Sequence, residues 1–310
     1  MPALICGSLA YDNIMVFNGR FKDQILPDQV HILNVSFQVP ELRREFGGCA
    51  GNIAYSLKLL GGEGDVMGTV GQDFASYANW MERNGLSRRH VRVIDDTYTA
   101  QAYITTDQDD NQITAFHPGA MNFSHLNVVP DDGGYSIGIV APDGREGMIQ
   151  HARQFAAAGI PFIFDPGQGL PLFNGEELLE FVGMASWIAV NDYESQMLAS
   201  RTGLGVEEIA RRVKALIVTR GAEGSRIFHD GKVTEIPCVK ARELRDPTGC
   251  GDAYRAGLLY GLMQGFDWET TGRIAALLGA IKIAHNGTQN HHFTPDEFRE
   301  SYREAFGHEF

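Results

Sequence analysis

Short apolar runs alternate with polar stretches along most of this chain, and that alternation limits the fold more than any other feature. The runs have the length of strands, and most of the stretches between them have the period of helices. Such a chain forms a mostly parallel sheet with helices on both faces. We therefore predict an α/β fold whose strands lie at residues 3–8, 65–70, 135–141, 161–165, 187–191 and 215–219.

Two regions depart from this alternation and predict a second, smaller sheet. Residues 30–37 alternate imperfectly between apolar and polar side chains, which favours a half-exposed strand over a helix. Two similar runs flank the polar turn at residues 107–111. We expect these segments to form a lid over the functional site, inserted in two pieces at about residues 13–45 and 98–120.

Charge and composition exclude several classes of partner. The formal net charge of −13 argues against a nucleic-acid surface, which needs clustered basic residues. The N-terminus lacks the basic region of a signal peptide, and no apolar run approaches the roughly 18 residues of a membrane span. The four cysteines have no CxxC spacing, and the adjacent His291 and His292 have no neighbouring ligand residues, so we expect no zinc site and place both histidines at the surface. We predict a cytoplasmic protein that binds a small polar molecule.

The stretch at residues 249–251 predicts an anion site. Gly249, Cys250 and Gly251 let the backbone turn tightly before an apolar helix expected at about residues 253–263. The turn leaves free N–H groups at the positive end of the helix dipole, where a phosphate binds without a lysine. Asp252 then either caps the helix or acts as a general base beside the phosphate. The Cys250 thiol, at a helix N-terminus, is expected to be partly activated.

Three further candidate residues lie in the first sixty residues. Asp12 follows the first strand, on the side where open α/β sheets bind ligands. Its carboxylate can accept hydrogen bonds from two neighbouring hydroxyls or form a simple Asx turn. Gly48 and Asn52 open a helix, where a glycine permits close approach of a ligand and an asparagine bonds to hydroxyls, or where both serve packing alone.

Two strand ends in the second half of the chain also carry polar groups. Asn191 and Glu194 would lie near a hydrated magnesium ion or simply begin a helix. Thr219, Gly221 and Gly224 would hold a phosphate tail or form an ordinary hairpin turn.

Neither common nucleotide fingerprint is present, but two other motifs are. Gly231-Lys232 is followed by Val233, which rules out a P-loop, and residues 249–254 do not spell GxGxxG. Residues 246–257, DPTGCGDAYRAG, resemble the C-terminal signature of the ribokinase-like (PfkB) carbohydrate and nucleoside kinases, and residues 47–52, GGCAGN, resemble their N-terminal signature. Within that family, the lid segments are most similar to those of bacterial and archaeal adenosine or nucleoside kinases.

The resemblance implies a single ribokinase-like α/β/α domain over residues 1–310 with a small β-sheet lid. It implies ATP-dependent phosphorylation of the 5′-hydroxyl of adenosine or a related nucleoside, by a monomer or homodimer. A kinase for a free sugar such as ribose or fructose is the alternative within the family. A ligand-binding regulator without catalysis is the alternative from another class.

The resemblance also implies a role for each candidate residue. Asp252 would take the proton from the sugar hydroxyl, while the N–H groups of Gly249, Cys250 and Gly251 would bind the transferring phosphoryl group. Sugar hydroxyls would be held by Asp12, Gly48 and Asn52. Apolar lid residues would sandwich the base, or else serve lid packing or a dimer interface; they are Leu33, Phe37 and Phe116.

The nucleotide and ion sites follow in the same way. ATP would be bound by Asn191, Thr219, Gly221, Gly224, His285 and Gly287. Glu194 would bind Mg²⁺ through water. Asp246 and Thr248 match positions beside a K⁺ ion in many relatives, but the second half of that potassium loop is not matched here, so a need for K⁺ stays open.

Overall fold

The larger sheet of the molecule is mostly parallel, as predicted. The computed structural model describes residues 1–25, 32, 34–109 and 111–310. Nine strands lie in the order β13-β12-β11-β10-β9-β8-β1-β4-β5. The seven strands β11, β10, β9, β8, β1, β4 and β5 run parallel to one another. Strands β12 and β13 extend the sheet beyond β11 as antiparallel strands. The strands are Ala3–Cys6 (β1), Gly64–Gly71 (β4), Ser87–Ile94 (β5), Ile137–Val140 (β8), Phe162–Phe164 (β9), Trp187–Asn191 (β10), Ala215–Thr219 (β11), Ser225–His229 (β12) and Lys232–Ile236 (β13).

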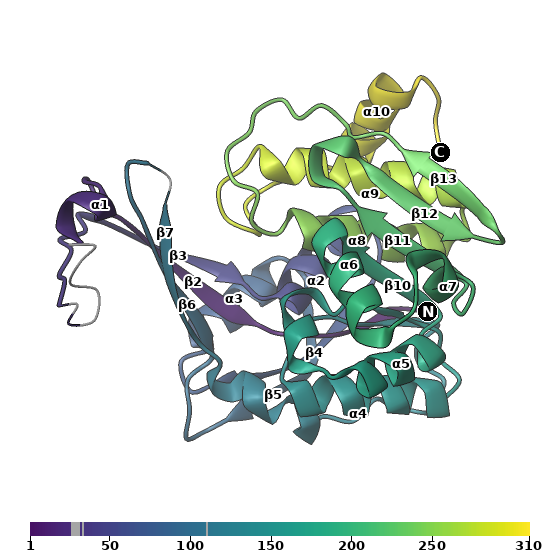
Figure 1. The fold of residues 1–310 in the computed structure, drawn as a ribbon, viewed down its shortest axis with the longest axis horizontal. Helices are drawn as coiled ribbons and strands as arrows, with labels where there is room; N and C mark the ends of the chain where they lie inside the picture. The colour runs from purple at the N-terminus through teal and green to yellow at the C-terminus, as the bar shows by residue number, and fades with distance from the viewer. Residues whose placement is uncertain (26–31, 33, 110) are drawn as a thin grey trace.

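Helices cover both faces of this sheet because successive side chains of each strand point to opposite faces. In β1, Ile5 packs into a hydrophobic cluster with α2, α8 and α9, whereas Leu4 packs into a second cluster with α4, α5 and α6. The result is a three-layer fold (Figure 1). The helices are Phe21–Gln24 (α1), Cys49–Leu59 (α2), Ala75–Arg83 (α3), Arg145–Ala157 (α4), Gly175–Met184 (α5), Asp192–Thr202 (α6), Val206–Ala210 (α7), Cys250–Gln264 (α8), Trp268–Ile283 (α9) and Pro295–Phe306 (α10).

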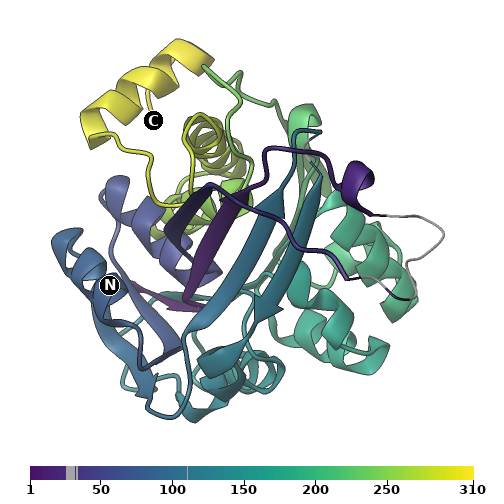
Figure 2. The ribbon, with the colours of Figure 1, turned by 90° about the vertical axis from the view of Figure 1, so that its left-hand side faces the viewer.

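Four strands form the separate lid sheet, which extends from the left of the molecule in Figure 1 and is turned toward the viewer in Figure 2. They are Ala10–Val16 (β2), Glu41–Gly47 (β3), Ala100–Thr106 (β6) and Gln112–His117 (β7), in the order β3-β2-β6-β7. Strands β2 and β6 are parallel, and the two outer pairs are antiparallel. The predicted lid, including both strands around the turn at residues 107–111, is confirmed.

The strand predicted at residues 30–37 is wrong for residues 34–37, which form no regular structure. The rest of that range, Ile32 apart, lies outside the described residues. The Phe37 ring packs on the rings of Phe17 and Phe21, at centroid distances of 4.9 and 5.0 Å. Phe37, an apolar residue of the predicted strand, therefore packs in an aromatic cluster. The lid strands β2 and β3 come from the segments before and after this region.

Candidate active site

Asp252 stands in the first turn of α8, in front of free backbone donors. The N-cap of α8 is Gly249, with φ of 77° and no side-chain cap, so the alternative of Asp252 as the capping residue is wrong. A Cβ at Gly249 would lie 2.9 Å from Thr288 Cγ2, which explains the glycine. Within the described chain, the N–H groups of Gly249, Gly251 and Asp252 have no protein acceptor, whereas the Cys250 N–H donates to the Pro247 carbonyl at 3.1 Å. The Gly249 and Gly251 N–H groups are therefore available to an anion, as the sequence predicts, whereas the Cys250 N–H, which is also predicted to donate there, is already bonded.

A chain of buried polar side chains holds the Asp252 carboxylate from behind. Asn52 Nδ2 donates to Asp252 Oδ2 at 2.7 Å. Gln289 Nε2 donates to Asn52 Oδ1 at 3.0 Å and to the Tyr77 hydroxyl oxygen at 2.6 Å. Trp80 Nε1 donates to Gln289 Oε1 at 2.9 Å, which fixes the orientation of that amide. Asn52 is therefore locked with its NH₂ group on Asp252 Oδ2.

The surroundings make Asp252 a better base than a free aspartate. Burial, and then the nearby Asp165 carboxylate, raises the pKa of Asp252 to about 6, against the Asn52 hydrogen bond and the Arg255 charge. A carboxylate with this pKa is still ionised at neutral pH, yet it holds a proton more readily than usual. This is the arrangement that accepts a proton from an alcohol.

A buried ion pair fixes the first turns of α8 to the main sheet. Arg255, one turn after Asp252, donates from Nε and Nη2 to the two Asp165 oxygens at 3.0 and 3.1 Å. Its Nη2 also donates to the Ala189 carbonyl at 3.2 Å. Both side chains are 5% exposed. Bidentate pairing of this kind sets the position of the helix, and with it the position of Asp252.

The lid contributes a second carboxylate to the same region. Asp12 lies within β2, so it is a lid residue and not part of a turn after β1. Burial, and then the charges of Asp246 and Glu45, raises the pKa of Asp12 to about 6. A Cβ at Gly47 would come within 2.5 Å of Asp12 Oδ2, so the glycine leaves room for this side chain. Asp12 of the lid and Asp246 of the anion loop, residues 246–251, are thus close enough for their charges to interact.

One face of the lid carries Asp12 together with Phe116. Asp12 is the direct Cα partner of Glu45 and Ala102, and Ala102 is the partner of Phe116. Residues directly opposite each other in neighbouring strands share a face of the sheet. Phe116 is 52% exposed, so an aromatic ring stands free on the face that presents the Asp12 carboxylate.

Four of the six predicted ATP-binding residues lie at the ends of β10 and β11. Asn191 and Thr219 are Cα partners in the parallel sheet, which brings the two turns together. Asn191 and Glu194 form a capping box at the start of α6, and burial raises the pKa of Glu194. Gly224 has φ of 82°, and a Cβ there would lie 2.1 Å from the Ile236 carbonyl oxygen. Both structural alternatives, a helix start and a hairpin turn, are therefore present at these positions.

His285 borders a cavity of about 770 Å³ between the segment after β13 and the C-terminal helices. Val239, Leu277 and Ile281 give this cavity an apolar part of its wall. Gly287, next along the loop, donates its N–H to Asp246 Oδ2 at 2.8 Å. The cavity thus adjoins the loop that is bonded to the anion loop.

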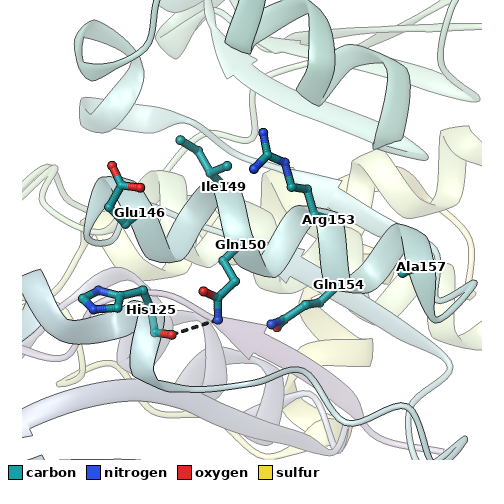
Figure 3. A pocket seen from close by; sticks show the side chains of 7 residues that line it. All are labelled: His125, Glu146, Ile149, Gln150, Arg153, Gln154 and Ala157. Carbon is teal, nitrogen blue, oxygen red and sulfur yellow. Dashed lines mark hydrogen bonds between the residues drawn. The ribbon is translucent and has the colours of Figure 1, made fainter.

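A second hollow, of about 490 Å³, is separate from these residues (Figure 3). It lies along α4, where the Gln150 amide donates to the His125 carbonyl oxygen at 2.8 Å. Arg153 at its edge is already paired with Glu180. None of the predicted site residues lines it.

Three expectations fare differently in this structure. The Cys250 thiol is not activated, because burial raises the pKa of Cys250 to about 11. His291 is fully buried, against the expected surface position, and its Nε2 lies 3.2 Å from Ser56 Oγ. Phe37 belongs to the aromatic cluster in the lid, and Leu33 lies outside the described residues.

Comparison with known proteins agrees with the geometry. The model of the pfkB family carbohydrate kinases matches residues 12–295. A nucleoside kinase from Burkholderia thailandensis, solved in complex with inosine, is 55% identical with a TM-score of 0.90 and covers 99% of both chains. The same kinase in complex with ADP-inosine superposes with a TM-score of 0.88, at 57% identity over 99% of this chain and 97% of that one.

An archaeal relative extends this comparison. A nucleoside kinase from Methanocaldococcus jannaschii is 35% identical over 83% of this chain and 85% of its own length. Its crystal structure gives a TM-score of 0.89 and covers 98% of this chain and 99% of that one.

Among the helices of the described residues, none is both long and apolar enough to cross a membrane.

Proposed function

Because this chain belongs to the pfkB family of carbohydrate kinases, we propose that it transfers the γ-phosphoryl group of ATP to the 5′-hydroxyl of a nucleoside, adenosine or a related one. The observation that carries this proposal is the Asp252 carboxylate, held by Asn52 in front of the free N–H groups of Gly249 and Gly251. A base and an anion site in contact are what an alcohol needs to attack a phosphoryl group.

In this reaction Asp252 accepts the proton of the 5′-hydroxyl as the sugar oxygen bonds to the γ-phosphorus. The bond from the γ-phosphorus to the β–γ bridging oxygen breaks, and ADP leaves with that electron pair. The free N–H groups at the start of α8 bind the negative oxygens of the transferring group. Asp12, Gly48 and Asn52 hold the sugar hydroxyls, which sets the angle of attack.

The ATP side of the site is argued from the strand ends. Asn191, Thr219, Gly221 and Gly224 would border the phosphates, and the cavity beside His285 would take the adenine. No cluster of three or more metal-binding side chains exists among the residues that the structure describes. This fits Mg²⁺, which keeps several waters and binds substrate phosphates. Glu194 would hold it through water, since the capping box occupies only its Oε2. When bound, Mg²⁺ neutralises charge on the phosphates.

A nucleoside is favoured over a free sugar by the lid. Phe116 stands exposed on the face that carries Asp12, and we infer that a base attached to a sugar held by Asp12 stacks on this ring. The relatives at 55% and 35% identity are both named nucleoside kinases, and one was solved with inosine. A free sugar would leave this ring without a partner. The cytoplasmic location and the monomeric or homodimeric state stay predictions from the sequence.

An acceptor panel tests the proposal. Purified protein is mixed with ATP and Mg²⁺, and ADP release is measured with adenosine, inosine, guanosine, cytidine, ribose and fructose. We expect kcat/KM to be higher for a purine nucleoside than for either sugar, and mass spectrometry and ³¹P NMR to identify a 5′-monophosphate. Higher kcat/KM for ribose or fructose would assign a sugar kinase. No ADP with any acceptor would point to a regulator without catalysis.

A further inference from the structure

Lys282 is a buried cation whose ammonium bonds to main-chain oxygens. It lies near the C-terminal end of α9 and is fully buried. Its Nζ donates to the Asp246 carbonyl oxygen at 2.7 Å and to the His285 carbonyl oxygen at 3.3 Å. Burying an ammonium is costly unless strong acceptors receive it, so these two contacts hold the lysine in a defined place.

The two carbonyls belong to the loops on either side of the anion site. Asp246 precedes Gly249 by three residues, and its two carboxylate oxygens accept from Thr248 N at 2.9 Å and Gly287 N at 2.8 Å. Its own N–H donates to the Ile283 carbonyl at 3.1 Å. Lys282 completes this set by bonding to both loops at once. Lys282 therefore ties the anion loop to the loop that carries His285 and Gly287.

A potassium ion does not fit these residues. Proteins bind K⁺ through several oxygens, often main-chain carbonyls, that replace its water. Here the Asp246 carbonyl already accepts from the Lys282 ammonium, and each Asp246 carboxylate oxygen accepts a main-chain N–H. A second cation beside Asp246 would meet the lysine charge at short range, and the two would repel.

We propose that Lys282 is a positioning residue whose ammonium acts as a built-in monovalent cation for the anion loop, so that phosphoryl transfer by this chain needs no K⁺. This inference rests on the proposed kinase function. Lys282 touches neither substrate nor phosphate in it. Its charge fixes the loop that presents the N–H groups of Gly249 and Gly251 to the phosphoryl group.

A simpler role for Lys282 is to stabilise the end of its helix. Lysines near a helix C-terminus bond to the last carbonyls and favour the negative end of the dipole. That role predicts lower stability on substitution, with no response to added cations. The chain offers a matched control in Lys58, which lies in the last turn of α2, is exposed and stands outside the proposed site.

The first test needs no variant. Activity of the wild-type protein on the best nucleoside is measured in K⁺-free buffer, with KCl, NaCl or tetramethylammonium chloride added at constant ionic strength. We expect full kcat without K⁺ and no response to it. Activity that appears only with K⁺ would overturn the inference while leaving the kinase proposal in place. Absence of activity in every buffer and with every acceptor would refute the kinase proposal itself.

The second test removes the charge in two ways. Lys282→Ala leaves a space beside the carbonyls, whereas Lys282→Met fills it with an uncharged chain of similar length. Displacing the anion loop by about 1 Å would lower kcat roughly 100-fold. We expect both variants to lose kcat with little change in KM for the nucleoside. Potassium or ammonium should restore kcat in Lys282→Ala but not in Lys282→Met, and Lys58→Ala should behave as the wild type.

Thermal melting of each variant separates folding from positioning. A Lys282→Ala protein that melts at a lower temperature but keeps wild-type kcat supports the helix-end role and contradicts ours. The same holds if kcat falls and no cation restores it while the protein remains folded. If neither variant folds, the wild-type assay still tests the inference, because activity that appears only with K⁺ overturns it.

Discussion

Residues Ala253 to Leu259 of α8, which follow Asp252 directly, are all buried, whereas the outer strand of the lid, β7, is exposed along its whole length. The carboxylates of the two regions show the same contrast. Burial raises the pKa of Asp252 to about 6. At the lid turn burial acts on Asp107 in the same direction, but hydrogen bonds from Phe21, Asn111 and Asp109 together lower its pKa to about 2. The Asp252 carboxylate can therefore accept a proton more readily than a free aspartate, whereas the Asp107 carboxylate is hydrogen-bonded within a turn.

This difference in burial indicates that the start of α8 controls the chemical step and that the lid controls which substrate binds. The base and the anion loop are fixed by buried contacts that span the chain, such as the bond from Asn52 to Asp252. The lid offers Phe116 on a strand that is exposed at every residue, where we expect it to contact a base. Variants at the start of α8 should therefore change kcat or stability, and variants on the lid should change KM.

The largest effect is expected from Asp252→Asn. Loss of a general base lowers kcat by about 10²-fold to 10⁴-fold. Asparagine keeps the shape and can still accept from Asn52, so KM for the nucleoside and the melting temperature should change little. Steady-state kinetics with the best nucleoside and a thermal melt provide the check. Near-normal kcat would remove Asp252 from the chemistry and erase the contrast with the lid.

The next effect is on stability, and it compares one ion pair from each region. Arg255→Met leaves Asp165 buried without its partner, which costs about 3–5 kcal/mol of unfolding free energy. In the lid, Arg20 pairs with Asp109, but the two side chains are 49% and 32% exposed. Arg20→Met should therefore cost at most about 1 kcal/mol. Urea unfolding measures both.

The double variant Arg255→Met with Asp165→Leu serves as the control for the buried pair. It removes both charges and should recover much of the lost stability. Equal losses for Arg255→Met and Arg20→Met would show that the two regions do not differ in the way that burial indicates.

Substrate affinity should respond to Phe116. Stacking of a base on an aromatic ring is worth about 1–3 kcal/mol, or about 5-fold to 150-fold in affinity. Phe116→Ala should raise KM for nucleosides by that factor and leave kcat and melting nearly unchanged. Tyr103→Ala is the matched control, because Tyr103 is 42% exposed and pairs with Asn13 and Ala115 on the opposite face of the lid. Equal changes in KM for both variants would place the base elsewhere.

The sequence predicts those parts of the molecule whose pattern is local. The buried strands of the main sheet are short apolar runs, and the anion loop with its helix is a continuous stretch at residues 249–264. The sequence does not predict strand β5. This strand carries three arginines and a histidine among its eight residues, so it lacks the apolar run of a central strand. It lies at the sheet edge, where exposed polar side chains are tolerated.

The supporting residues of the site could not be predicted, because they depend on contacts between distant segments. Gln289 bonds to Asn52 across 237 positions, and no motif surrounds it. His291 is buried because the Tyr55 hydroxyl and the Ser56 side chain of α2 bond to it. Lys282 has the sequence neighbours of any helix-end lysine, and only the fold places its ammonium on the Asp246 carbonyl.

The smallest effect is a pH dependence with a stated sign. Asp252 must be ionised to accept a proton, so kcat/KM should fall about tenfold for each pH unit below about 6. The fold raises this pKa from 3.8, so the folded state binds the proton more tightly, and protonation of Asp252 stabilises it as the pH falls from about 6 to 4. Asp107 has the opposite shift, and its contribution to stability is lost only as the pH falls from about 4 to 2. Activity should therefore disappear while the protein stays folded.

Asp12→Asn tests whether the loss of activity comes from Asp252, because the pKa of Asp12 is also about 6. The Asp12→Asn variant should keep the acid limb of kcat, whereas Asp252→Asn should abolish it.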